Sequence, residues 1–148
     1  MRTFFVLISV CCLAFPALAF DIQGHRGARG LMPENTLPAF DKALTIGVTT
    51  LELDVGVTKD GVVVISHDPA LNPDIARNTG GKWINDTVLL KDIMFSDVEK
   101  YDVGRAKPGS RVAQRFADQM PVDGTRMPAL SELFRLVKQS GNETVRFN

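Results

Sequence analysis

An alternating segment within residues 48–58 constrains the fold more than any other feature of the sequence. From Leu51 to Val57 every second residue is apolar, and the positions between carry Glu52, Asp54 and Gly56. Side chains of an extended chain point alternately to opposite faces, whereas a helix would scatter this pattern around its axis. The segment therefore predicts one β-strand with a buried apolar face and a second face that carries two carboxylates.

A return strand is predicted directly after this segment. The Lys-Asp-Gly sequence at residues 59–61 is a tight-turn signal, and a second apolar stretch follows over residues 62–66. If the Asp-Gly pair forms a two-residue turn, the hairpin register places Asp54 opposite His67. We therefore expect the hairpin to bring a carboxylate and an imidazole together.

A strand and a helix are predicted ahead of the alternating segment. Residues 22–25 form a short apolar stretch that ends in a glycine-rich loop. Asn35 or Thr36 can cap a helix whose apolar residues share one face, and Gly47 is placed to end that helix. The order along the chain is thus strand, helix, strand and return strand.

The same alternation of strands and helices resumes near the end of the sequence. Pro128 introduces a second helix, Gly141 is placed to end it, and residues 144–148 begin another strand. Strands that alternate with helices predict an α/β architecture with a parallel sheet or barrel. Because a barrel needs more strands than these, we expect residues 20–148 to be the N-terminal part of a larger barrel domain.

Residues 69–126 form a long, irregular insertion between these regular parts. Paired Asn, Pro and Gly residues mark its loops. Ser96 and Glu99 have capping-box spacing, which predicts one helix inside the insertion. A long irregular segment in a compact domain is usually functional, so we expect a lid or a binding loop here.

The N-terminus has the pattern of a secretory signal peptide over residues 1–19. Arg2 precedes an apolar run that is shorter than the roughly 20 residues of a membrane span, and the small residues of Ala-Leu-Ala at 17–19 suit cleavage. Cleavage would remove both cysteines and leave no stable membrane span. We therefore expect an exported protein, either periplasmic or secreted; an uncleaved anchor is the alternative.

The balance of charge argues against two classes of partner. Seventeen Lys and Arg residues match seventeen Asp and Glu residues, so the formal net charge is zero. Binding to nucleic acid or to an anionic membrane usually needs a basic excess. We therefore expect no nucleic-acid partner.

Four side chains in the regular part could carry chemistry together. Glu52 and Asp54 would share one strand face about 7 Å apart, where their oxygens could converge on a hard cation such as Ca²⁺ or Mg²⁺. A solvated strand face is the alternative. His25 and His67 each follow a short apolar strand, and imidazole is the side chain best suited to proton transfer near neutral pH. Surface histidines are the alternative.

Arg26 lies among glycines beside His25. A guanidinium group next to free backbone amides is a plausible clamp for a phosphate group. An ordinary surface arginine is the alternative. Glu34 could contact this site or could simply favour the start of the following helix.

The order of these motifs resembles the glycerophosphodiester phosphodiesterase family. The resemblance rests on the His-Arg-Gly-Ala sequence at 25–28, Pro-Glu-Asn-Thr at 33–36, Glu-Leu-Asp-Val at 52–55, Thr-Lys-Asp-Gly at 58–61 and His-Asp at 67–68. It covers residues 22–69 and continues more weakly through residues 97–104 and 127–133.

The resemblance implies a (β/α)8 TIM barrel of the phospholipase C-like type, of which this chain is roughly the first half. It implies hydrolysis of a small glycerophosphodiester to an alcohol and glycerol 3-phosphate. Glu52 and Asp54 would bind a divalent cation, Ca²⁺ or Mg²⁺, His25 and His67 would act as general acid and base, and Arg26 would hold the phosphate. A third metal-binding carboxylate is expected beyond Asn148.

Two other functions remain open from the sequence. One is a related barrel phospholipase, of the phosphoinositide phospholipase C or sphingomyelinase D type, which an exposed apolar rim on the insertion would favour. The other is a binding module that retains the phosphate site without catalysis.

Overall fold

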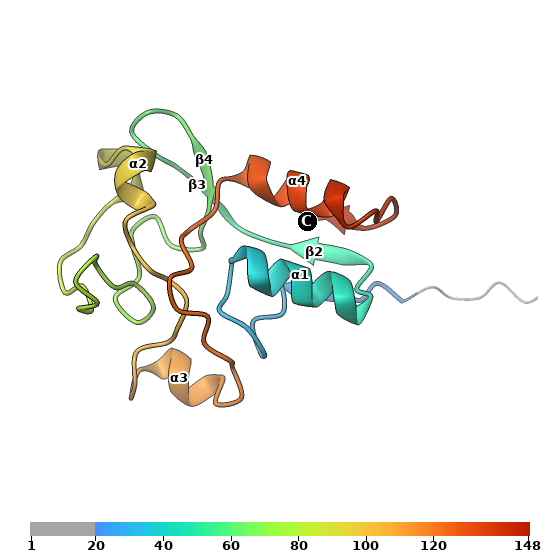
Figure 1. Cartoon of the computed structure of the whole chain (residues 1–148), viewed down its shortest axis with the longest axis horizontal. Coiled ribbons are helices and arrows are strands. Elements are labelled where there is room, and N and C mark those ends of the chain that lie inside the picture. The colour runs from blue at the N-terminus through green and yellow to red at the C-terminus, as the bar shows by residue number, and fades with distance from the viewer. Residues whose placement is uncertain (1–19) are drawn as a thin grey trace, which may run out of the picture.

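The structure is a computed structural model that describes residues 20–148, so the predicted signal peptide lies outside the described residues (Figure 1). Three short strands, β1 (Gln23–His25), β2 (Thr50–Glu52) and β5 (Arg146–Phe147), form a parallel sheet in the order β1-β2-β5. The predicted parallel α/β arrangement is therefore confirmed. In the part that the structure describes, no helix is long and apolar enough to cross a membrane.

Helix α1 (Leu37–Ile46) connects β1 to β2 and begins and ends where its sequence predicts. The hydroxyl of Thr36 accepts a hydrogen bond from the Ala39 amide at 3.3 Å, so Thr36 and not Asn35 is the N-cap. Gly47 ends the helix in the left-handed conformation, with φ of 86°, which glycine adopts without steric cost.

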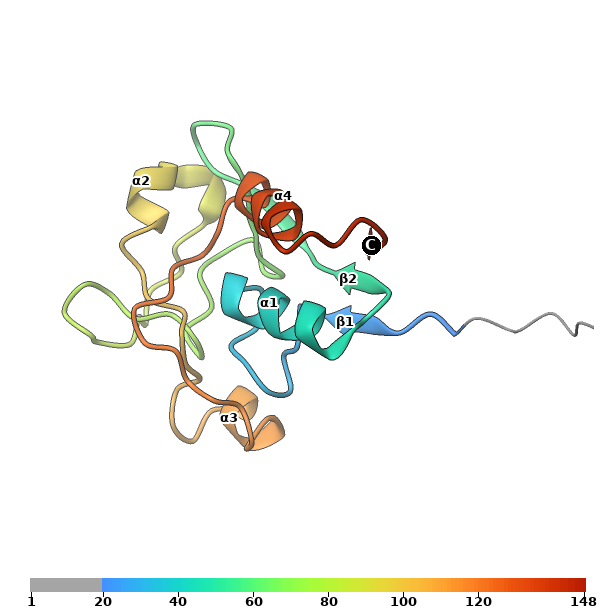
Figure 2. The same cartoon turned by 45° about the vertical axis from the view of Figure 1, so that its right-hand side comes forward.

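Helix α4 (Leu130–Gln139) precedes β5 and packs against α1 (Figures 1 and 2). Its start is fixed by the Glu132 carboxylate, which accepts from the Ala129 amide at 2.9 Å and pairs with Arg126. Leu133 and Val137 of α4 join Phe40 of α1 in one buried cluster beside the sheet. Burial of the two amphipathic faces against the same strands holds this part of the chain together.

The alternating segment does not form one strand, and this prediction is wrong. Strand β2 ends at Glu52, and a separate strand, β3 (Val55–Val57), pairs with β4 (Val63–Ile65) in an antiparallel ribbon. The predicted buried face is also lost there, because Val55 and Val57 are 54% and 51% exposed. The chain leaves the parallel sheet between the two strands, at the point where the two carboxylates lie.

The hairpin register also differs from the prediction by one residue. Val57 pairs with Val63, and the Thr58 amide donates to the Val62 carbonyl at 3.0 Å, so the connecting loop has three residues. Gly61, with φ of 82°, completes a loop of this length. Asp54 consequently lies opposite Ser66, whose amide donates to the Asp54 carbonyl at 3.0 Å, and not opposite His67.

The insertion contains three short helices: η1 (Leu90–Asp92), α2 (Phe95–Val98) and α3 (Arg111–Arg115). Ser96 lies inside α2, so the predicted capping box is wrong. The cap comes from the hairpin loop instead, because Asp60 Oδ1 accepts from the Phe95 amide at 3.0 Å. Hydrogen bonds from Thr58 and from that amide lower the pKa of Asp60.

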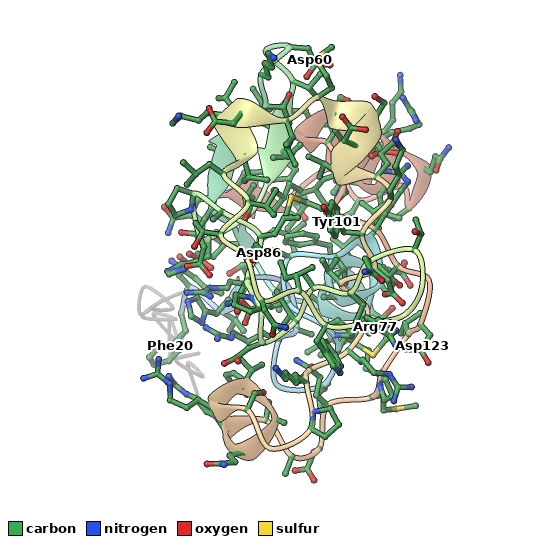
Figure 3. All side chains as sticks on the ribbon, turned by 90° about the vertical axis from the view of Figure 1, so that its left-hand side faces the viewer. Phe20, Asp60, Arg77, Asp86, Tyr101 and Asp123 are labelled. Atoms are coloured by element: carbon green, nitrogen blue, oxygen red, sulfur yellow. The ribbon has the colours of Figure 1, made fainter. Side chains whose placement is uncertain are left out.

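An arginine at the centre of the insertion joins segments that are far apart in the sequence. Arg77 pairs with Asp102 and with Asp123, and its guanidinium group lies 5.4 Å from the ring centre of Trp83. Figure 3 shows Arg77 and Asp123 beside each other at the side of the molecule. Arg105 also pairs with Asp123. These contacts tie the loop that carries α3 to the rest of the insertion.

Gly104 in this loop allows a close contact between two backbone segments, and a substitution there tests the packing. A Cβ atom at Gly104 would lie 1.8 Å from the Val122 carbonyl oxygen, which is a backbone atom that cannot move alone. We expect Gly104→Ala to lower the free energy of unfolding by about 3 kcal/mol, as measured by urea denaturation of the full-length protein. Gly80→Ala, whose Cβ would meet only a side chain at 3.4 Å, is the control. Equal stability of both variants would contradict the packing described here.

Candidate active site

The loop after β1 is tied to the end of β2 by one hydrogen bond. The Arg26 amide donates to Glu52 Oε2 at 2.8 Å. Arg26 has φ of 51°, a left-handed conformation that costs free energy in a residue other than glycine. Because His25 pairs with Glu52 across the two parallel strands, the imidazole Nε2 lies 3.8 Å from the same carboxylate oxygen.

The Arg26 side chain lies among carboxylates. Its Nη1 donates to Glu34 Oε1 at 2.8 Å, and its Nε lies 3.5 Å from Asp54 Oδ2. The predicted phosphate clamp is therefore only partly as expected: the backbone amide of Arg26 is engaged by Glu52, and the guanidinium group is held in place by two further residues. This arrangement orients the guanidinium group before any ligand binds.

Glu34 is buried between two arginines. Its second oxygen lies 2.8 Å from Nη2 of Arg29, so one carboxylate holds the guanidinium groups of both Arg26 and Arg29. Burial, together with the nearby cations Arg26 and Arg115, lowers the pKa of Arg29, and Glu34 opposes this shift. Glu34 thus contacts the site, which the sequence left open, and Arg29 is a site residue that sequence reasoning missed.

The two histidines occupy different surroundings. Nδ1–H of His67 donates to Asp68 Oδ1 at 2.8 Å, and Asp68 Oδ2 accepts from the Asn72 side chain at 2.9 Å. Asp68 therefore fixes the imidazole orientation and leaves Nε2 of His67 available. His25 accepts a long hydrogen bond at Nδ1 from Arg29, at 3.4 Å, and its ring is more than half exposed.

A cavity of about 640 Å³ opens beside these groups. Arg26, Arg29 and Glu34 form one wall, His67 and Asp68 form a second wall, and α3 with the following Phe116 forms a third. The structure therefore brings Arg26 and His67 to one cavity, whereas His25, Glu52 and Asp54 lie outside its lining. The arginines of α3 form a further part of the cavity wall, and no motif in the sequence marks them.

Glu52 and Asp54 fit as part of a site for a hard divalent cation. Both carboxylates are partly exposed at the junction of β2 and β3, and Asp54 Oδ2 is a buried oxygen without a hydrogen-bond partner. Carboxylate oxygens are the ligands that Ca²⁺ and Mg²⁺ prefer. Within residues 20–148, no group of three or more His, Cys, Asp or Glu residues is placed to hold a metal ion. The two carboxylates therefore account for only some of the ligands that such a cation takes.

Comparisons with known proteins place the chain in a family. The model of the glycerophosphoryl diester phosphodiesterase family matches residues 25–147, so the chain belongs to this family. The resemblance seen in its motifs is thereby confirmed.

Relatives and solved structures agree with this assignment. The chain is 34% identical over 116 residues to a glycerophosphodiester phosphodiesterase of Caldanaerobacter subterraneus, covering 78% of this chain and 40% of the relative. It is also 34% identical over 139 residues to a lysophospholipase D of Rattus norvegicus, covering 88% of this chain and 40% of the relative. The chain thus spans about two fifths of the length of the curated relatives that it matches.

Two solved structures have a similar fold. A protein of Silicibacter pomeroyi assigned to the glycerophosphoryl diester phosphodiesterases superposes with a TM-score of 0.84 at 34% identity, over 90% of this chain and 45% of that one. A phosphodiesterase of Oleispira antarctica in complex with the product sn-glycerol-3-phosphate gives a TM-score of 0.60 at 25% identity, over 86% and 42% of the two chains.

Because Glu34 pairs with two arginines, its removal should lower the stability of the protein. Glu34→Ala would leave two nearly buried guanidinium groups without their common partner, and breaking a buried ion pair costs about 3 kcal/mol or more. We expect the midpoint of urea unfolding of the full-length protein to fall accordingly. Glu143→Ala, at an exposed position, is the control. A Glu34→Ala variant as stable as this control would show that Glu34 does not hold the loop.

Proposed function

We propose that the protein hydrolyses glycerophosphodiesters to an alcohol and glycerol 3-phosphate, with a divalent cation and with His25 and His67 as general acid and base. The observation that carries the proposal is the meeting of Arg26 and His67, from distant segments, at one cavity next to the Glu52 and Asp54 carboxylates. Membership of the family and the product named in the Oleispira antarctica complex support the same reaction.

Each side chain has a part in this proposal that follows from its contacts. The guanidinium group of Arg26, held by Glu34, binds a phosphoryl oxygen and stabilises the charge that develops on it. Asp68 orients His67 so that Nε2 exchanges a proton with a reacting oxygen. His25, fixed between Arg29 and Glu52, exchanges the second proton.

Glu52 and Asp54 would hold the cation, either Ca²⁺ or Mg²⁺. When bound, this cation would act as a Lewis acid that polarises the phosphoryl group. The Arg26 amide keeps Glu52 in position for this task, because its hydrogen bond occupies Oε2 and leaves Oε1 unengaged by any hydrogen bond of the described residues.

The fold of the complete domain is also proposed from membership of the family. We propose that β1, β2 and β5 are the first parallel strands of a (β/α)8 barrel, with the site at their carboxyl ends. A further metal-binding carboxylate then comes from a later strand. Export through the signal peptide at residues 1–19 is also proposed, on the sequence pattern alone.

A lysophospholipid is the second candidate substrate. Leu31 and Met120 are 43% and 67% exposed, and they adjoin each other because the Met120 amide donates to the Leu31 carbonyl at 2.8 Å. This pair lies next to the segments that line the cavity, and an acyl chain would find apolar surface there. The lysophospholipase D of Rattus norvegicus is a relative with such an activity in its name.

Release of glycerol 3-phosphate by the full-length protein tests the proposed reaction. We expect turnover of glycerophosphoglycerol in the presence of Ca²⁺ or Mg²⁺, and we expect His25→Ala and His67→Ala each to lower kcat by about 100-fold or more, because each removes a proton-transfer group. Lys42→Ala, on the exposed face of α1, is the control.

Lysophosphatidylcholine is assayed in parallel to compare the two candidate substrates. Undiminished turnover in either histidine variant would remove that residue from the mechanism. Absence of turnover on every diester, with the fold intact by circular dichroism, would contradict the proposed activity itself.

A further inference from the structure

The α3 wall of the cavity carries positive charge that the protein does not neutralise. Arg111 and Arg115 both line the cavity, and neither forms an ion pair with any residue in the range 20–148. Arg26 and Arg29 on the facing wall differ, because Glu34 pairs with both. The arginines at the proposed phosphate position therefore share one carboxylate, Glu34, whereas the two arginines of α3 have no ion-pair partner within residues 20–148.

Direct contacts hold α3 against the loop after β1. The Arg29 guanidinium group lies 4.5 Å from the ring centre of Phe116, and that of Arg115 lies 5.5 Å from the same ring. Gln119 donates to the Arg29 carbonyl at 2.8 Å, and the Ser110 hydroxyl caps α3. In Figures 1 and 2, α3 lies apart from the other helices and below α1, so these contacts join it to the site.

The acidic residues of the cavity offset the positive charge of the α3 wall only in part. Glu34 is occupied by two arginines, and Asp68 is occupied by His67 and Asn72. Asp74 is the remaining acidic residue of the lining, so one carboxylate is left to balance the two positive charges of Arg111 and Arg115. Burial is the main cause of the lowered pKa of Arg29, and the nearby cations Arg26 and Arg115 lower it further. An anion bound near α3 would relieve this repulsion.

We propose that the α3 wall, formed by Arg111, Arg115 and Phe116, binds the alcohol portion of the substrate and selects glycerophosphodiesters whose alcohol carries a further anionic group, such as a second phosphodiester. This inference rests on the proposed function, because it assigns the scissile phosphate to Arg26. The glycerol arm is neutral and gains little from two unpaired arginines, so the charged wall faces the other arm of the diester. A quaternary ammonium group, as in choline, would be repelled there.

Two substrates with the same scissile linkage test this proposal. 1,3-Bis(glycerophospho)glycerol and glycerophosphoglycerol differ by the second phosphodiester, and glycerophosphocholine supplies the cationic alcohol. For the full-length protein we expect kcat/KM for the bis compound to exceed that for glycerophosphoglycerol by about tenfold, which is the size expected of a charge-assisted contact. Glycerophosphocholine should be the poorest of the three. The preference should shrink as ionic strength rises, because salt screens exposed charges.

Variants of the α3 arginines test whether these residues cause the preference for the anionic substrate. The double variant Arg111→Gln/Arg115→Gln should lower kcat/KM for the bis compound about tenfold more than for glycerophosphoglycerol. The two substrates should then have nearly equal kcat/KM, and salt should no longer change their ratio. Arg135→Gln/Lys138→Gln, which removes two exposed positive charges on α4, is the control and should keep the full preference.

The outcomes separate this inference from the proposed function. Equal kcat/KM for the three substrates, or a preference that survives the double variant, would overturn the assignment of the α3 wall while leaving the hydrolysis intact. Absence of hydrolysis of every substrate by the wild-type protein would overturn the proposed function instead, and the α3 assignment with it.

Discussion

The site depends on one hydrogen bond between the loop after β1 and the end of β2, from the Arg26 amide to the Glu52 carboxylate. It holds Arg26 in a left-handed conformation that a residue with a side chain adopts only when its surroundings impose it. That conformation turns the chain back at the end of β1 and directs the guanidinium group toward Glu34 and Asp54. The parallel pairing of β1 with β2 thereby places an imidazole, a guanidinium group and two carboxylates at one end of the sheet.

Sequence patterns predicted the elements that are delimited by interactions between residues close together in the chain. Thr36 and Gly47 delimit α1 because a hydroxyl cap and a left-handed glycine act within a few residues. Parallel pairing also followed from the alternation of strands and helices. The hairpin register failed because the Lys-Asp-Gly sequence is compatible with loops of two or three residues, and one residue reverses which side chain lies opposite Asp54.

The features that could not be predicted depend on contacts between distant segments. Ser96 fits a capping box, yet Asp60 from the hairpin loop provides the cap of α2. Arg29 and Arg115 carry no motif. Arg29 joins the site through its ion pair with Glu34, and Arg115 joins it because α3 folds back onto the loop after β1 through Phe116. The candidate site was thus predictable where motifs name its residues, and its third wall required the tertiary structure.

Calorimetric titration of the full-length protein with Ca²⁺ and with Mg²⁺ tests whether Glu52 and Asp54 bind a divalent cation at the end of β2. We expect Glu52→Gln and Asp54→Asn each to weaken the affinity at least about tenfold, and Glu143→Gln to leave it unchanged. Glutamine at position 52 can still accept from the Arg26 amide, so a loss would report on the charge and not on the loop. Unchanged affinity in both variants would contradict the assignment of the two carboxylates.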